Sequence, residues 1–235
     1  MVTRKQFATV SAELLIVILG VMIALAADSW REDIQEAKIA AEYLDRLKRD
    51  VSSGLIVLAK ERARYAQVRR SARIVIDTLD GRQDSVDEQL LVEHLIVAAQ
   101  TGFDQEEMAS DVTYNELVVS GRLNLIRDHS LRESVVAYYR GAQRLSFGLQ
   151  RLPAVNYVVG ALTGALPIEY SSFGEELSAA GRDRLVQALQ SDPELVRDIR
   201  QLHSELTFID RLFESLISQG RQLLANMEYP LNEGN

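Results

Sequence analysis

The amino-acid sequence predicts an all-α protein, with an N-terminal transmembrane helix continuous with a long helix and followed by an up-and-down helical bundle. Three observations predict this fold class. The segment from Phe7 to Ala27 carries a single charge, and its length suits a membrane span. From Ile34 onward, the apolar residues recur at helical spacing and never alternate as in a strand for more than a few positions. Capping signals divide this region into short-looped helices.

The predicted span runs from Phe7 to Ala27. At about 1.5 Å per residue, a helix of this length reaches about 32 Å, and a bilayer core is about 30 Å thick. Trp30 follows the span and is typical of an interfacial anchor, because its ring has both apolar and polar parts. We therefore divide the chain into three parts: a short cytoplasmic tail (1–6), a transmembrane helix (7–27) and a helical bundle domain (28–235).

The same segment has an alternative interpretation as a cleaved signal peptide. Arg4 and Lys5 form a basic start, and Ala24-Leu25-Ala26 resembles a cleavage site. Glu13 within the apolar region and Trp30 after it favour the span. Short basic tails rarely cross a membrane, whereas long domains cross largely regardless of charge. We therefore expect the N-terminus in the cytoplasm and the bundle outside it.

One face of the predicted span combines small residues with the single acid. At about 100° per residue, five residues fall within roughly 40° of one line: Thr9, Glu13, Gly20, Ala24 and Ala27. Gly20 and Ala24 let another helix backbone approach closely, and Glu13 can form a hydrogen bond across the contact. This face predicts packing against a partner helix. The alternative is that Glu13, about 9 Å along the helix from Phe7, only reaches water near the membrane edge.

A long helix is predicted to run from the membrane to about Leu79. Apolar residues recur every seventh position along it, with three more at intervening core positions. The seventh-position residues are Leu44, Val51, Leu58, Tyr65, Ala72 and Leu79, and the intervening ones are Leu47, Val68 and Val75. Gly54 and Glu61 interrupt this seam, which favours packing within a bundle over a regular coiled coil.

Capping signals and glycines set the expected bounds of the remaining helices. Asp80-Gly81 ends the long helix, and a capping box at Ser85–Glu88 opens the next. A third helix ends at Ser120-Gly121, and a second capping box at Ser130–Glu133 opens a fourth. The last helix starts at Asp192-Pro193. Its expected core positions are Leu195, Ile199, Leu202, Leu206, Ile209, Leu212, Phe213, Leu216 and Leu223.

The segment from Leu152 to Ile168 carries no charge. Its length is at the lower limit for a membrane span, and Pro153 and Pro167 interrupt it. We therefore expect a buried, kinked helix of the bundle. The alternatives are insertion into the membrane and contact with the membrane surface.

The composition argues against several classes of function. Without Arg4, Lys5 and Glu13, the 26 basic and 34 acidic residues become 24 and 33, so the rest of the chain carries about −9. This charge argues against nucleic-acid binding. There is no cysteine, the three histidines lack metal-ligand spacing, and neither a nucleophile elbow nor a phosphate-binding glycine loop occurs. We therefore expect no enzymatic activity, no metal and no cofactor.

A basic segment, Lys60 to Arg73, carries six positive residues and one negative residue. Arg62, Arg69 and Arg73 share one stripe of the helix by phase, so they predict a site for an anion or an acidic partner. The alternative is a solvated helix face whose arginines pair with acidic residues of the bundle. The acidic residues expected for this role are Asp104, Glu106, Glu107 and Asp111.

Two groups of motifs carry a resemblance to a known family. The first group is the acid-headed apolar segment ending in Ala24-Leu25, followed by Trp30-x-Glu32 and Tyr43-Leu44-x-Arg46-Leu47-x-x-Asp50. The second is Tyr114-x-x-Leu117-x-x-Ser120-Gly121-x-Leu123-x-x-Ile126, followed by Leu131-Arg132 and Tyr138-Tyr139. With these motifs the chain resembles a bacterial family of single-pass membrane proteins of unknown function, with an N-terminal transmembrane helix and an all-helical body. The resemblance implies this topology and the bacterial inner (cytoplasmic) membrane, and it implies no activity.

These predictions combine into a hypothesis of function. We expect a non-enzymatic, membrane-anchored accessory or scaffold subunit of a membrane complex, which docks through the face that carries Glu13 and Gly20. The expected partners are the lipid bilayer and other membrane-protein helices, in a homo- or hetero-oligomer, with no nucleic acid. The alternative is a membrane-tethered sensor or binding module for a small anionic ligand near Arg62, Arg69 and Arg73.

Overall fold

The computed structural model describes residues 4–82, 87–99, 111–152 and 179–228, together with Val158 and Gly160. The side chains of residues 4–16, 88, 99 and 179 are not among those described. Over this part of the chain the fold is all-α and contains no strand, which confirms the predicted class. The elements are α1 (Arg4–Leu79), α2 (Glu88–Ala99), α3 (Val112–Val119), the 3₁₀ helix η2 (Arg122–Leu125), α4 (His129–Gln150), α6 (Ala179–Ser191) and α7 (Pro193–Glu228).

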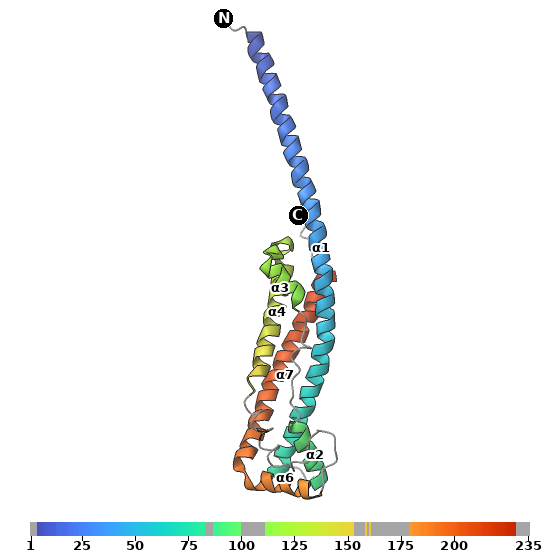
Figure 1. The fold of residues 1–235 in the computed structure, drawn as a ribbon, viewed down its shortest axis with the longest axis vertical. Coiled ribbons are helices and arrows are strands. Elements are labelled where there is room, and N and C mark those ends of the chain that lie inside the picture. Colours follow the sequence, from blue (N-terminus) through green and yellow to red (C-terminus); the bar gives the residue numbers. More distant parts are fainter. Residues whose placement is uncertain are drawn as a thin grey trace.

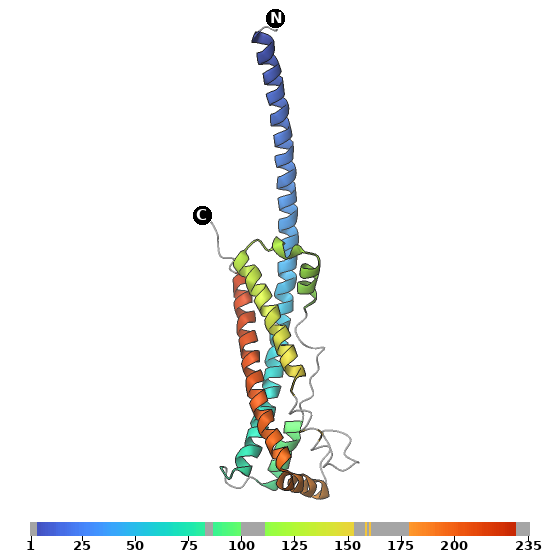
Figure 2. The same cartoon turned by 90° about the vertical axis from the view of Figure 1, so that its left-hand side faces the viewer.

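The described helices form an elongated bundle from which α1 projects (Figures 1 and 2). α1 and α4 run in one direction and α7 runs in the other, packing against both. α3, η2 and the start of α4 lie at the end from which α1 projects, whereas α2 and α6 lie at the opposite end (Figure 1). The predicted helical bundle is therefore confirmed.

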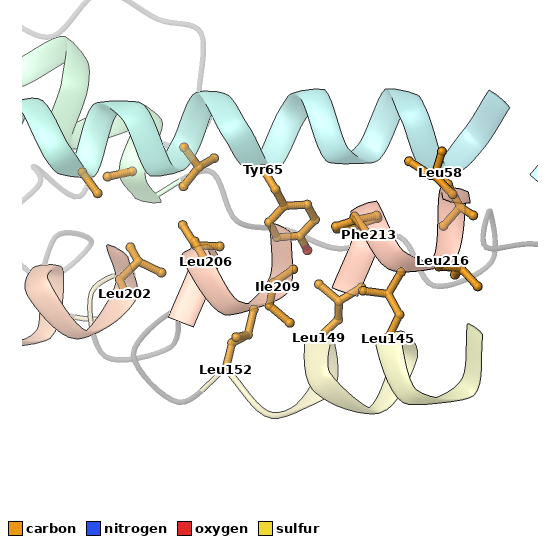
Figure 3. Packing of buried hydrophobic residues seen from close by; sticks show 14 of the residues in the cluster. Leu58, Tyr65, Leu145, Leu149, Leu152, Leu202, Leu206, Ile209, Phe213 and Leu216 are labelled. Atoms are coloured by element: carbon orange, nitrogen blue, oxygen red, sulfur yellow. The ribbon is translucent and has the colours of Figure 1, made fainter. Parts of the chain in front are cut away.

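The core of the bundle follows the predicted spacing of α1. Of its nine predicted core residues, Leu44 and Leu79 are half-buried and the other seven are buried. The nine predicted positions of α7 are likewise buried, except for the half-buried Leu212. In Figure 3, Leu58 and Tyr65 of α1 point toward Phe213 and Leu216 of α7. Leu145 and Leu149 of α4 pack against α7 from the opposite side. The Tyr65 and Phe213 ring centroids are 5.7 Å apart.

Local signals fix several helix ends as predicted, and one differently. Gly81 and Gly121 adopt positive φ angles of 64° and 69° just after α1 and α3, a conformation that glycine accepts without strain. Asp192 caps α7, because its carboxylate accepts hydrogen bonds from the Glu194 and Leu195 backbone amides. The predicted cap at Ser130 is wrong. The carboxylate of Asp128 accepts the Leu131 amide hydrogen bond instead, so α4 starts earlier.

The predicted transmembrane helix is not supported by the part of the chain that the structure describes. No helix found there is both long and apolar enough to cross a membrane. The 18 residues from Val17 to Ile34, about the shortest length that can cross a membrane, include four charged residues: Asp28, Arg31, Glu32 and Asp33. Residues 7–16 of the predicted span lie outside the residues with described side chains.

Three predicted segments fall partly outside the described residues. Of the apolar segment Leu152 to Ile168, the structure describes Leu152 and Val158, which are buried, and Gly160, which is exposed. The capping residues Ser85 and Val86 and the first part of the predicted third helix, up to residue 110, also lie outside. The described part of that third helix is α3, which ends at Ser120-Gly121 as expected.

Candidate functional site

The projecting part of α1, which we define as Val17–Lys38, does not alternate between exposed and buried side chains. Every side chain in it is exposed, and the first half-buried residue is Ile39. Its large apolar side chains between residues 17 and 25 are 51% to 63% exposed: Val17, Ile18, Leu19, Val21, Met22, Ile23 and Leu25. Contact with another helix of the bundle begins only further along α1, as the two views show (Figures 1 and 2). A bare helix of this composition is a candidate interaction surface.

Three of the five residues of the predicted packing face lie on the projecting part of α1. Gly20, Ala24 and Ala27 are exposed, whereas the side chains of Thr9 and Glu13 lie outside the described residues. A Cβ atom placed on Gly20 would meet no other atom within 4 Å. The structure therefore leaves room on this face for another backbone to approach.

A polar junction fixes α1 where it leaves the bundle. Arg127 binds Asp33 and lies 3.5 Å from Glu36, which ties the loop before α4 to the projecting part. Further into the bundle, Glu116 of α3 accepts hydrogen bonds from the Tyr43 hydroxyl at 2.7 Å and from Arg46 at 2.6 Å. These hydrogen bonds lower the pKa of Glu116, with Arg46 as the main cause.

The end of the bundle around this junction exposes apolar side chains. Trp30 on α1 is 70% exposed, and Val118 and Val119 on α3 are 48% and 88% exposed. They belong to elements that lie at the same end of the bundle (Figure 1). Exposed apolar side chains therefore occur beside the charged residues of the junction.

The basic segment of α1 pairs mainly with α7. Asp210 accepts hydrogen bonds from Arg62 at 2.8 Å and from Arg69 at 3.0 Å, and Arg62 also lies 3.5 Å from Glu214. The hydrogen bond from Arg62 is the main cause that lowers the pKa of Asp210. Among the described residues, Asp210 and Glu214 hold Arg62 and Arg69. Of the acidic partners expected from the sequence, Asp111 makes no ion pair with these arginines, and Asp104, Glu106 and Glu107 lie outside the described part of the chain.

A cavity of about 340 Å³ adjoins this segment between α1 and α7. Arg69, Arg70 and Arg73 line it from α1, and His203 and Thr207 line it from α7. Arg62, which the sequence placed on the same stripe, does not line this cavity. Burial lowers the pKa of His203, and the neighbouring Arg73 and Arg69 lower it further.

A second cavity of about 380 Å³ lies beside two stacked tyrosines, Tyr114 of α3 and Tyr139 of α4, whose ring centroids are 4.4 Å apart. The buried hydroxyls of Tyr138 and Tyr139 have no hydrogen-bond partner within the described structure. Burial raises the pKa of Tyr138 to about 12 and also raises that of Tyr139. Neither phenol is therefore a base near neutral pH, and the pair packs as core.

The described residues contain no cluster of histidine, aspartate and glutamate that is suited to a metal. His94 contacts the Ser71 hydroxyl, whereas His129 lies near Glu133 at the other end of the bundle. His203 belongs to the basic cavity. Among the described residues, the three histidines therefore do not form a shared metal site.

In comparisons with known proteins, no family model matches this chain, and no curated protein or solved structure matches it. The resemblance to a bacterial family of single-pass membrane proteins is therefore wrong. The motifs that suggested it have a structural explanation: Tyr43 and Leu47 are core residues of α1, and Arg46 pairs with Glu116.

Sequence reasoning missed two residues of the basic cavity. Arg70 follows Arg69 and lies three positions before Arg73, so a broader stripe at i, i+3 and i+4 spacing includes it. His203 lies on another helix, far along the chain from Arg73. No local signal connects these two residues, because only the packing of α7 on α1 brings them together.

Proposed function

We propose that the protein is a non-enzymatic accessory or scaffold subunit of a membrane complex, and that it docks through the projecting part of α1. One observation carries this proposal: large apolar side chains from Val17 to Leu25 are exposed on the part of α1 that no other described helix covers. Contiguous exposed apolar surface marks an interaction site, because leaving it in water has a free-energy cost.

The distribution of side chains around α1 supports lipid as one partner and a helix as the other. At about 100° per residue, the large apolar residues cover roughly two thirds of the circumference. The small residues Gly20, Ala24 and Ala27 occupy the remaining arc. A single partner helix fits this arc, where backbones can approach closely, and lipid chains suit the rest.

The proposed docking helix combines the described residues Val17–Ala27 with residues 7–16 as one apolar segment. The backbone of α1 is helical from Arg4 onward. The sequence is uncharged from Leu14 to Ala27, and the segment from Phe7 to Ala27 contains the single acid Glu13. Glu13 is proposed to form hydrogen bonds with the partner helix on the same face as Gly20 and Ala24.

The end of the bundle supports the same arrangement. Trp30, Val118 and Val119 are exposed around the base of the projecting helix. An aromatic residue with aliphatic neighbours suits the boundary between lipid and water. We propose that this end of the bundle faces the membrane.

A matched pair of alanine variants tests the docking face. Ala24→Leu places bulk on the small-residue arc, whereas Ala26→Leu makes the same change about 160° away around the helix. Both residues are exposed, so neither change disturbs the bundle. We expect affinity purification of the full chain from gently solubilised membranes to lose its co-purifying subunits in Ala24→Leu and to retain them in Ala26→Leu. Equal recovery from both variants, or a lone monomer from the unmodified chain, contradicts docking through this face.

A second pair of variants tests the lipid contact. Ile23→Asp introduces a charge on the projecting part, where Ile23 is 63% exposed, and Phe208→Asp introduces one on the bundle, where Phe208 is 57% exposed. We expect Ile23→Asp to move the protein from the alkali-washed membrane fraction to the supernatant, because a charge in lipid costs about 3 kcal/mol. Phe208→Asp is expected to remain in the membrane fraction. An unmodified chain found wholly in the supernatant overturns the proposal.

A further inference from the structure

The basic cavity is lined by one face of α1 and by two residues of α7. Its lining residues on α1 are Ala66, Arg69, Arg70 and Arg73, which share one helix face at i, i+3, i+4 and i+7 spacing. His203 and Thr207 are one turn apart on α7 and close the cavity from the other side. The two helices lie along each other here, and Figure 3 shows their core side chains Tyr65 and Leu206 on the same stretch.

The arginines of this cavity are oriented by carboxylates but retain free donors. Arg69 uses Nη1 to bind Asp210 at 3.0 Å, and Arg73 uses Nε to bind Asp77 at 2.7 Å. A guanidinium group has five N–H donors, so both side chains have others to offer. Arg70 is exposed and makes no ion pair with any other residue that the structure describes. Three guanidinium groups therefore meet two carboxylates, one of which is shared with Arg62.

From this arrangement we propose that the cavity binds a small phosphate-type oxyanion, either as the free ion or as the phosphate group of a small metabolite. Arg70 and the free donors of Arg69 and Arg73 bind its oxygens, and the His203 imidazole forms the opposite wall. Arginine suits this role because its planar group offers paired donors to a phosphate. The volume of about 340 Å³ lies within the range of about 300 to 1,000 Å³ that is typical of small-molecule sites.

The position of the cavity distinguishes a soluble anion from a lipid headgroup. Trp30 and Arg70 lie on one unbroken helix, and at about 1.5 Å per residue they are about 60 Å apart along its axis. If the projecting part enters a membrane, the cavity lies far from its surface. A dissolved anion reaches this site, whereas a headgroup of the same membrane does not.

Calorimetric titration of the full, detergent-solubilised chain tests this site. Inorganic phosphate, glycerol 3-phosphate and phosphatidylglycerol vesicles are titrated separately into the unmodified chain, Arg70→Gln and the control Arg140→Gln. Arg140 is an exposed arginine of α4, so both variants lose the same charge and keep the ion pairs of Asp210 and Asp77. We expect saturable phosphate binding that weakens about tenfold or more in Arg70→Gln and is unchanged in Arg140→Gln, since one charged hydrogen bond is worth about this factor.

Histidine NMR gives a second, independent readout. In the free protein, burial and the neighbouring Arg73 and Arg69 lower the pKa of His203. A bound anion favours the imidazolium form, so saturating phosphate should raise this pKa. Arg70 lines the same cavity and is removed only in Arg70→Gln, whereas Asp77, which raises this pKa, is present in every variant. The ring signals of His94 and His129, which do not line this cavity, serve as internal controls for the response to phosphate.

Each outcome decides the proposal. A tenfold loss in Arg70→Gln together with the His203 response supports it, and tighter binding of glycerol 3-phosphate identifies a phosphate ester as the occupant. The proposal is overturned if phosphate affinity falls equally in Arg70→Gln and Arg140→Gln, or if bound phosphate leaves the pKa of His203 unchanged. Either result would mean that phosphate is held only by non-specific charge attraction. Vesicle binding that depends on Arg70 overturns it in favour of a lipid headgroup. None of these results depends on docking through the projecting helix.

Discussion

Helix α1 contains two regions that share one backbone and differ in how their side chains are covered. In the projecting part, Val17–Lys38, all side chains are exposed and apolar residues occur on most sides of the helix. In the packed part, from Tyr43 to Leu79, apolar residues recur at heptad spacing and are buried within the bundle, where α1 contacts α7, α2 and α3. Both parts are helical, so helix formation alone does not determine whether side chains are buried. The spacing of the apolar residues does, because it decides whether one face of the helix or most of its circumference is apolar.

The charged residues of the two regions differ in the same way. In the packed part, Arg62 and Arg69 converge on Asp210, which is only 18% exposed. In the projecting part, Asp33 and Glu36 pair with Arg127 at the junction, whereas Asp28 and Arg31 have no ion-pair partner among the residues that the structure describes. We therefore expect bundle stability to respond to loss of a packed charge such as Asp210 and not to loss of Asp28.

The largest expected difference comes from one substitution made in both regions. Leu58→Ala removes a side chain with no exposure in the packed part, and we expect it to lower the free energy of unfolding by about 2 to 5 kcal/mol. Leu19→Ala removes a side chain that is 56% exposed, and its effect should stay within about 0.5 kcal/mol. Urea unfolding of the solubilised chain, followed by circular dichroism, measures both. A large loss in Leu19→Ala contradicts the assignment of this region as independent of the bundle.

Two helical glycines sharpen the comparison. A Cβ atom on Gly220 of α7 would lie 2.8 Å from a methyl carbon of Leu55 on α1 and 2.9 Å from the ring of Tyr138. We expect Gly220→Ala to destabilise the bundle by about 1 to 3 kcal/mol through overpacking. Gly20→Ala meets nothing within 4 Å and should not destabilise, since alanine favours the helix. The same unfolding measurement tests both, and a neutral Gly220→Ala indicates that α7 stands further from α1 than the structure shows.

The sequence predicted those parts of the fold that depend on local signals. Leu79 ends α1 because Gly81 supplies the left-handed turn after it, and Asp192-Pro193 opens α7 through a cap and a proline in the first turn. The heptad residues of α1 are buried because their spacing follows directly from helix geometry. The start of α4 was misjudged, since Ser130 and Asp128 are both good caps and only the structure distinguishes them.

The candidate sites depend on contacts between distant segments and were predicted less well. Spacing along α1 identified Arg69 and Arg73, but their partner Asp210 and the facing His203 lie on α7. Helix α6 was not predicted separately, although Ser178, directly before its first residue, is a residue type that often caps helices. The apolar N-terminal segment was recognised from its composition, yet composition does not show what covers it.

The smallest expected effect concerns the shared carboxylate of the packed part. We expect Asp210→Asn to lower the free energy of unfolding at neutral pH by about 1 kcal/mol, because Arg62 and Arg69 lose their charged acceptor. The pKa of Asp210 is lowered in the fold, chiefly by Arg62. Its contribution is therefore fully present above the unfolded value of about 3.9 and is lost as the pH falls through the folded value.

This pH dependence separates a charge effect from a packing effect. The stability difference between the unmodified chain and Asp210→Asn should be largest near pH 7 and should begin to shrink below about pH 4, where the unfolded chain takes up the proton. It should vanish only at a lower pH, below the lowered pKa of Asp210 in the fold, where the native carboxylate is also neutral. Asp28→Asn makes the same change in the projecting part and should leave bundle stability unaltered at every pH. Urea unfolding across this range measures both. A difference for Asp210→Asn that stays constant down to acidic pH means that the side chain acts through its shape, and the electrostatic contrast between the two regions of α1 then fails.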